Sequence, residues 1–133
     1  MCIRDRITQD KNIKIVTNAG GLNPKSMAQE ITKVVEELDL DLKVSYIDGD
    51  DLIPEIDKLT DLGEKFSNLD KNIDLKEYSK KAITANAYLG AWGIKEALDN
   101  GADVVVCPRV TDAAVVIGPA LSLIHISEPT RPR

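Results

Sequence analysis

The chain has 133 residues, of which 22 are acidic and 17 are basic, so its formal net charge at pH 7 is −5. This acidic balance, together with only 4% aromatic residues, argues against a nucleic-acid-binding protein, because such proteins gather Lys and Arg on one face. No apolar run approaches the roughly 20 residues that a membrane helix needs, so we expect no membrane partner.

Both ends of the chain carry segments that we interpret as translated sequencing adapter. A coding string for Met1–Arg6 has a reverse complement that translates as Leu-Ser-Leu-Ile-His-Ile, and these residues stand at 121–126. We therefore expect residues 1–6 and 121–133 to be artefacts. Residues 7–120 are then expected to be a partial α/β domain, which would contact the remaining parts of a longer chain. Cys107 is then the one native thiol, which is too few for a disulfide framework or a zinc site and indicates a reducing, cytoplasmic setting.

The first expected unit is a strand followed by a helix. Residues 13–17 are rich in β-branched side chains and predict a buried strand, which Asn18-Ala19-Gly20-Gly21 ends. Asn23 then offers an N-cap oxygen, and Pro24 suits the first helical position. The helix that follows is indicated by an apolar stripe at helical spacing, made of Met27, Ile31, Val34, Val35 and Leu38.

The middle of the chain predicts a second strand and a short helix. Residues 43–47 form the strand, which the acidic run Asp48-Gly49-Asp50-Asp51 ends. Pro54 can start a helix that continues through Leu59. Residues 63–72 are polar with little periodicity and predict a loop.

The last part predicts a central helix, a buried strand and a further helix. We expect the central helix to run from about Leu75 or Ser79 to Leu98, because small residues crowd its middle, and Asn100-Gly101 to cap it. Residues 102–107 form a continuous apolar run, which suits a strand covered on both faces. Thr111 or Asp112 can cap the last helix. This alternation predicts a three-layer α/β fold with a mostly parallel, Rossmann-like sheet, present as an incomplete fragment.

A candidate site follows from this fold class, because ligands of open α/β sheets bind beyond the carboxyl ends of the strands. Polar residues come after each expected strand, with Thr17 at the end of the first and Asp48 directly after the second, and Asn86 stands on the expected central helix. The candidate ligand-binding residues are Asn18, Gly20, Gly21, Asn23, Asp50, Asp51, Asn86, Arg109, Thr111 and Asp112.

Each cluster has a functional and a structural interpretation. The loop 18–23 opens a helix N-terminus that favours an anion such as the phosphate of a nucleotide or coenzyme A, or it is an ordinary capped turn. The aspartates at 48–51 favour a hard cation or a solvated surface, and we predict no metal site because three aspartates leave a coordination shell incomplete. Arg109 can clamp a carboxylate or phosphate, or pair with an Asp112 that caps the next helix. We expect Cys107 to be a buried structural thiol, since no native histidine is present to activate it, and Asn86 and Tyr88 either to line the site or to pack.

Five segments of the chain carry a family resemblance. They are Ile15–Pro24 (IVTNAGGLNP), Ile47–Leu52 (IDGDDL), Ala85–Ala91 (ANAYLGA), Gly101–Val105 (GADVV) and Arg109–Ala114 (RVTDAA) with Gly118-Pro119. In this order they resemble the acyclic terpene utilisation protein A family. Pro108 departs from the pattern, since a glycine is expected before the arginine. The resemblance covers nearly all of residues 7–120.

The resemblance implies a piece of a protein several times longer, from the bacterial breakdown of acyclic terpenes such as citronellol and geraniol alongside a geranyl-CoA carboxylase. It carries over no catalytic residue and no cofactor, and it leaves open whether the protein is an enzyme. We expect a catabolic protein that binds a small anionic or acyl-CoA-type ligand at the strand ends. The alternatives are a non-catalytic accessory or assembly module that binds carboxylase subunits, and a nucleotide-binding domain of Rossmann type.

Overall fold

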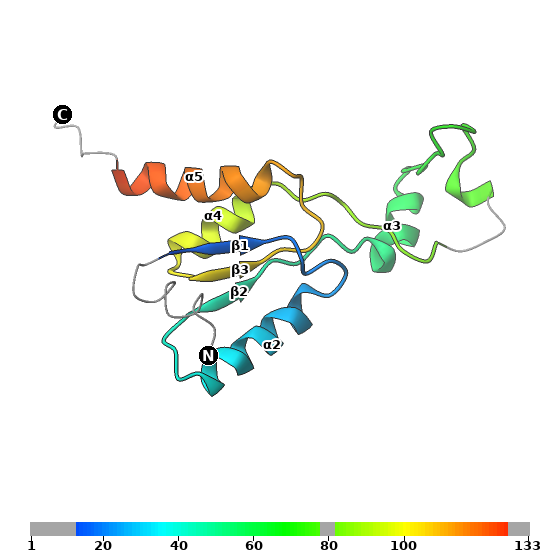
Figure 1. The fold of residues 1–133 in the computed structure, drawn as a ribbon. Coiled ribbons are helices and arrows are strands. Elements are labelled where there is room, and N and C mark those ends of the chain that lie inside the picture. The colour runs from blue at the N-terminus through cyan, green and yellow to red at the C-terminus, as the bar shows by residue number, and fades with distance from the viewer. Residues whose placement is uncertain (1–12, 78–81, 128–133) are drawn as a thin grey trace, which may run out of the picture. The chain divides into compact units, whose positions relative to one another are not determined.

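The computed structural model describes residues 13–77 and 82–127, with side chains described up to residue 124 (Figure 1). The chain divides into two compact units, and each is described by itself. Unit 1 comprises Met1–Asp50 and Tyr88–Arg133, and unit 2 comprises Asp51–Ala87.

A parallel sheet of three strands is the centre of unit 1. The strands are β1 (Ile15–Thr17), β2 (Val44–Tyr46) and β3 (Val104–Val106), in the order β1-β3-β2. Both outer strands pair with β3 in parallel, with Val105 opposite Val16 on one side and Ser45 on the other. All three valines of β3 are buried, as expected for a central strand. The predicted parallel sheet is confirmed, with strands shorter than the apolar runs that predicted them.

Helix α2 (Pro24–Glu37) packs on one face of this sheet. Asn23 caps it by accepting a hydrogen bond from the Ser26 backbone N–H at 3.0 Å, and Pro24 occupies the first turn. Its apolar stripe brings Ala28 against Val104 and Val106 of β3. The helix and its cap therefore follow the prediction. Of the predicted stripe, Val35 is buried and Met27, Ile31 and Leu38 are partly buried, whereas Val34 is 49% exposed.

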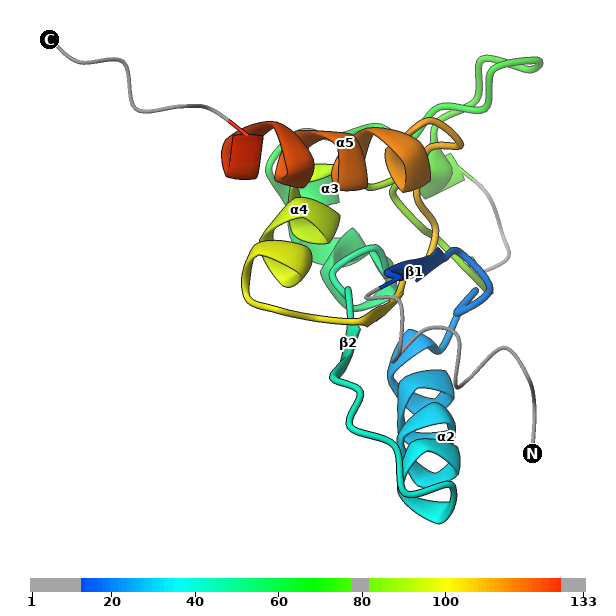
Figure 2. The ribbon, with the colours of Figure 1, turned by 60° about the vertical axis from the view of Figure 1, so that its left-hand side comes forward.

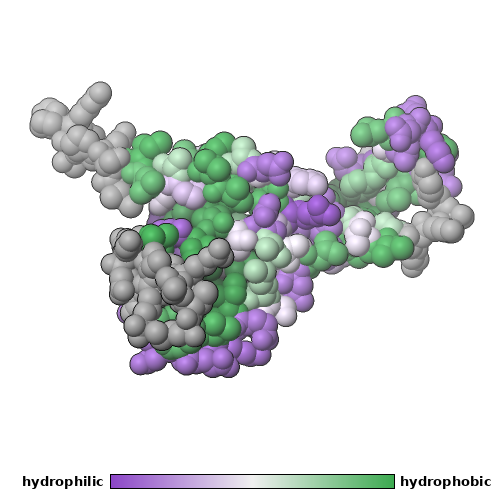
Figure 3. Space-filling view, in the orientation of Figure 1, coloured by the Kyte–Doolittle hydropathy of each residue, from purple (hydrophilic) through white to green (hydrophobic). Residues whose placement is uncertain are grey.

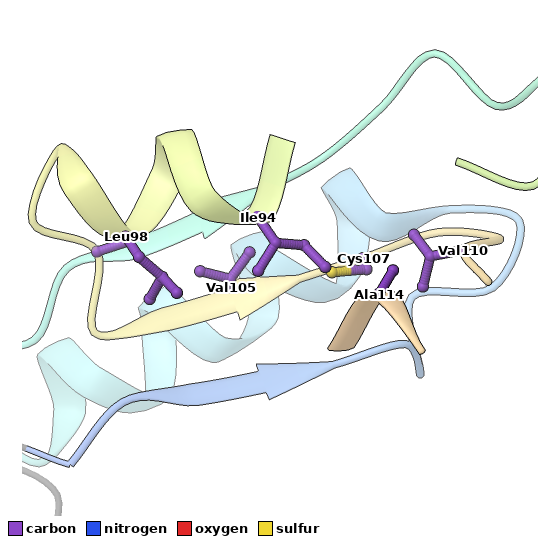
Figure 4. Packing of buried hydrophobic residues seen from close by; sticks show 7 residues of the cluster. Ile94, Leu98, Val105, Cys107, Val110 and Ala114 are labelled. Atoms are coloured by element: carbon purple, nitrogen blue, oxygen red, sulfur yellow. The ribbon is translucent and has the colours of Figure 1, made fainter. Parts of the chain in front are cut away.

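Helices α4 (Trp92–Asp99) and α5 (Ala114–Ser127) cover the opposite face (Figures 1 and 2). Ile94 and Leu98 of α4 point toward Val105 in Figure 4, where Ala114 of α5 joins the same cluster. Val105 meets this cluster while its neighbours in β3 face α2, because successive side chains of a strand alternate between faces. Unit 1 is thus a small α/β fold with helices on both sides of its sheet.

The two helices of this layer approach closely at Gly118. A Cβ atom on Gly118 would lie 2.5 Å from Cγ2 of the fully buried Ile94, so only glycine permits this spacing. Hydrophobic residues make up much of the surface of α5 that Figure 3 shows. Val116 of this helix is 70% exposed. None of the helices in the described part of the chain has the length and apolar character to span a bilayer.

Unit 2 contains short helical segments and loops. They are η1 (Ile53–Glu55), α3 (Ile56–Asp61) and η2 (Leu75–Glu77). A helix beginning around Pro54 and a loop over 63–72 were predicted, and both are confirmed. None of the residues of this unit that the structure describes is fully buried.

The predicted central helix from Leu75 or Ser79 to Leu98 is wrong over most of its length. Residues 78–81 lie outside the described residues, residues 82–91 are not helical, and α4 begins only at Trp92. The reason lies in the backbone hydrogen bonds. In a helix the Ala85 carbonyl would accept from the Leu89 N–H, but here Ala85 accepts from the Leu52 N–H at 2.8 Å and Leu89 donates to the Arg109 carbonyl at 3.0 Å. Pairing with distant segments has replaced the helix.

Candidate functional site

The carboxyl ends of the three strands lie side by side. The backbone N–H of Cys107 donates to the Thr17 carbonyl at 2.7 Å, and the N–H of Ile47 donates to the Val106 carbonyl at 2.9 Å. The segments that leave β1, β2 and β3 therefore start from one edge of the sheet, because both outer strands run parallel to β3. We call the residues of unit 1 that follow the strands at this edge, namely 18–23, 48–50 and 107–112, the rim.

The loop from β1 to α2 packs tightly against the turn after β3. Gly20 is buried, and a Cβ atom on it would lie 2.6 Å from the Cys107 carbonyl oxygen. Gly21 adopts a φ of +55°, the left-handed region that favours glycine. Asn18 is exposed, whereas the side chain of Asn23 is engaged in capping α2. Of the candidate ligand-binding residues in this loop, Asn23 and Gly20 thus have clear structural roles.

Asp50 anchors the turn that carries Arg109. The Asp50 side chain is only 5% exposed, and its Oδ2 accepts a hydrogen bond from the Arg109 backbone N–H at 3.4 Å. Gly49 permits this approach with a φ of +95°. Because the carboxylate is buried and turned toward the backbone, it positions Arg109 rather than presenting itself to solvent. Asp48, two residues earlier, is exposed.

The guanidinium of Arg109 lies against Tyr88. Its Nη1 donates to the Tyr88 hydroxyl at 3.4 Å, and its Cζ is 5.8 Å from the centroid of the Tyr88 ring. Both side chains are exposed, so this is a surface feature of the rim. The ion pairs among the described residues do not include Arg109, and the alternative pairing of Arg109 with Asp112 is therefore not formed.

Thr111 and Asp112 are exposed at the end of the rim. The Thr111 N–H donates to the Leu89 carbonyl at 3.0 Å, and the Thr111 carbonyl accepts from the Ala114 N–H at 2.8 Å. Helix α5 begins at Ala114, so Ala113 stands at the position before the helix where we had expected Thr111 or Asp112. The polar side chains of both residues face solvent.

Two candidates, Asp51 and Asn86, belong to unit 2 and are brought together there. They form an antiparallel backbone bridge with each other. Oδ1 of Asp51 also accepts a hydrogen bond from the Ile53 N–H at 3.0 Å, which starts the helical turn η1. These contacts join two segments of unit 2 through their backbones and begin a short helical turn.

Cys107 is fully buried, and burial raises the pKa of its thiol to about 11. The thiol is therefore protonated at neutral pH, as expected for a structural cysteine.

Within the residues described, no three His, Cys, Asp or Glu side chains lie close enough together to hold a metal ion.

Tyr88 contacts the rim residue Arg109 but is not among the candidate ligand-binding residues chosen from the sequence. Its segment was expected to be helical, which would have left its side chain either lining the site or packing. The available signal was its place in the segment Ala85–Ala91, one of the five that carry the family resemblance.

Comparison with known protein families identifies the family of this chain. The sequence model described as "Acyclic terpene utilisation family protein AtuA" matches residues 4–124, whereas no curated protein and no solved structure matches the chain. The match begins and ends inside the two segments interpreted as adapter, and that interpretation stays a prediction. Because the match covers most of the sequence and includes all five resembling segments, the chain belongs to the acyclic terpene utilisation (AtuA) family.

Proposed function

We propose that this chain is part of a catabolic protein of acyclic terpene or acyl-CoA breakdown, and that its rim binds a small anionic ligand. The observation that carries the proposal is Arg109, an exposed guanidinium that forms no ion pair among the described residues, in a chain with more acidic than basic residues. A guanidinium in such a place can grip a carboxylate or a phosphate through two parallel hydrogen bonds.

The placement of Arg109 supports this role. Its backbone is held by the buried Asp50 carboxylate, and the turn that carries it packs against the loop around Gly20. A cation on a fixed backbone loses less conformational freedom when it binds an anion. In the proposed site Asn18 and Gly21 lie on the loop that faces the anion, and the exposed Asp112 orients polar groups of the ligand.

The acidic residues limit which ligands suit the site. Asp48 and Asp112 are both exposed at the rim, and their charges oppose a highly charged anion. A ligand with one carboxylate, or one phosphate on an otherwise polar molecule, fits this mixture of charges better than a polyphosphate. A carboxylic acid from the breakdown of an acyclic terpene is the class that we propose. We also propose that the sheet continues, in the whole protein, into a larger three-layer domain of Rossmann-like fold.

The test is anion binding by the unaltered chain and by two charge variants. Binding is measured by isothermal titration calorimetry with inorganic phosphate, a short branched carboxylate and coenzyme A. Arg109→Ala is expected to weaken binding at least about 10-fold, because hydrogen bonds to charged groups contribute about 1.5–3 kcal/mol. Lys71→Ala removes one positive charge from an exposed position of unit 2 and serves as the matched control. Equal affinity in Arg109→Ala and the unaltered chain would contradict the proposal.

A second candidate function is an accessory module that docks on carboxylase subunits. The exposed apolar side chains of Trp92 (72%) and Val116 (70%) favour it, because exposed apolar groups on adjoining helices often mark a protein interface. Co-purification with carboxylase subunits, lost in Val116→Lys and retained in Arg109→Ala, would distinguish this function from anion binding.

A further inference from the structure

We infer that Tyr88 is a positioning residue, which holds the Arg109 guanidinium at the rim so that an incoming anion meets a cation already in place. This inference rests on the proposed function, since it names the residue that prepares the same site. Tyr88 is not among the candidate ligand-binding residues, so its role is an addition to the proposed site.

The backbone brings the two residues together. Leu89 donates its N–H to the Arg109 carbonyl at 3.0 Å and accepts from the Thr111 N–H at 3.0 Å, which pairs Leu89 with Val110 in parallel. Tyr88 and Arg109 each directly precede a residue of that pair. In parallel strands, residues at equal distances from a paired position lie side by side and point the same way. The juxtaposition of the two side chains is thus built into the chain path.

Tyr88 makes two kinds of contact with the guanidinium. The hydroxyl accepts a hydrogen bond from Nη1 at 3.4 Å, which is longer than the usual roughly 2.7–3.2 Å and marks a weak bond. The Cζ atom is 5.8 Å from the ring centroid, within the distance at which a guanidinium is attracted to the face of an aromatic ring. Each contact is weak alone, but together they restrict a long side chain that would otherwise sample many rotamers.

A packing role does not account for Tyr88. Its side chain is 63% exposed, so it contributes little to the core of unit 1. The two contacts also leave guanidinium N–H groups available, because Nη1 has one acceptor in Tyr88 and the ion pairs of the described residues leave Arg109 without a carboxylate. Tyr88 thus orients the cation without neutralising it, which is what an anion site needs.

Two variants separate the contributions of the ring and the hydroxyl. Tyr88→Phe keeps the aromatic face and removes the acceptor, whereas Tyr88→Ala removes both. With inorganic phosphate as the probe, Tyr88→Ala is expected to weaken binding about 3- to 5-fold and Tyr88→Phe about 2-fold or less, from the strength of exposed cation–π contacts. Tyr46→Phe, which removes a hydroxyl from β2, is the control and should bind phosphate as the unaltered chain does.

A second measurement needs no ligand and reports on the guanidinium directly. The Arg109 Nε–Hε signal in a spectrum of arginine-labelled protein, assigned with Arg109→Lys, should carry an upfield ring-current shift. The shift should persist in Tyr88→Phe and vanish in Tyr88→Ala, with faster side-chain motion in the latter, while circular dichroism shows that the fold is kept.

The outcomes distinguish the two proposals. Phosphate binding that Arg109→Ala loses but Tyr88→Ala retains, together with an unchanged Arg109 signal in Tyr88→Ala, would overturn this inference and leave the proposed function standing. An unaltered chain that binds none of the anions would overturn both.

Discussion

A Cβ atom on Gly20 would lie 2.6 Å from the carbonyl oxygen of Cys107 and 2.8 Å from Cβ of Pro24, so the loop after β1 touches the turn after β3 backbone to backbone. Nothing in this contact can move like the end of a flexible side chain. The loop, the first turn of α2 and the turn that leads to Arg109 are therefore packed as one body, and the rim takes its geometry from that contact.

Gly20→Ala is expected to destabilise the fold by about 1–3 kcal/mol, because the added methyl group must push backbone atoms apart. Gly90→Ala is the matched control, since nothing lies within 4 Å of the Cβ position there and its φ is not in the left-handed region. Urea unfolding of the two variants measures the difference. Equal stability of Gly20→Ala and Gly90→Ala would show that the contact at Cys107 is not tight.

Asn23→Ala is expected to cost about 1 kcal/mol of unfolding free energy, because the variant loses the hydrogen bond that caps α2. Asn23→Ser keeps a capping oxygen and should retain most of the stability. If the Asn23 side chain only caps the helix, Asn23→Ser should also bind phosphate as well as the unaltered chain. A large loss of anion binding in a stably folded Asn23→Ser would instead indicate that the Asn23 side chain contacts the anion.

Cys107 is expected to react with thiol reagents only when the protein unfolds. Burial raises the pKa of its thiol to about 11, so at pH 8 the reactive thiolate is scarce as well as inaccessible. The experiment uses the variant Cys2→Ser, which lacks the other thiol. The rate at which Cys107 reacts with an aromatic disulfide is measured, with and without urea, from the absorbance of the released aromatic thiolate. Rapid reaction of the folded protein at pH 8 would contradict the burial of Cys107.

Asp103 is expected to make stability depend on pH at the acid end. Burial alone would raise its pKa, but the hydrogen bonds from the Lys14 side chain and the Lys43 backbone N–H, with the charges of both lysines, lower the pKa below its ordinary value of 3.8. A carboxyl group with a lowered pKa stabilises the folded state above its ordinary pKa, and this stabilisation is lost as the pH falls through the lowered value.

The measurement for Asp103 is the free energy of unfolding at pH 7 and below pH 4. Asp103→Asn should lose stability at pH 7 and show a smaller change between the two conditions than the unaltered chain. Asp41→Asn, at an exposed position outside the ion pairs of the described residues, should keep the original pH dependence. Identical pH profiles for Asp103→Asn and the unaltered chain would rule out this contribution.

The sequence by itself determined the elements whose signals are local. The three valines of β3, the apolar stripe of α2 and the cap at Asn23 each depend on residues within a few positions of one another. The valines and the cap appear in the structure as expected, and so does the stripe except for the exposed Val34. The parallel sheet followed from the alternation of these elements, and the common edge of its strand ends followed from the parallel sheet. The family, too, could be read from five short segments in order.

Only the tertiary structure decided how the rim is built. Residues 82–91 contain good helix formers, yet the Leu89 backbone pairs with Arg109 and Thr111, about 20 positions further along the chain. That pairing places Tyr88 beside the guanidinium. In the same way, only the tertiary structure shows that Asp50 is buried and accepts a hydrogen bond from the Arg109 backbone N–H. Such contacts join segments that are distant in sequence, and local propensity carries no information about which distant backbone will satisfy a given N–H or carbonyl group.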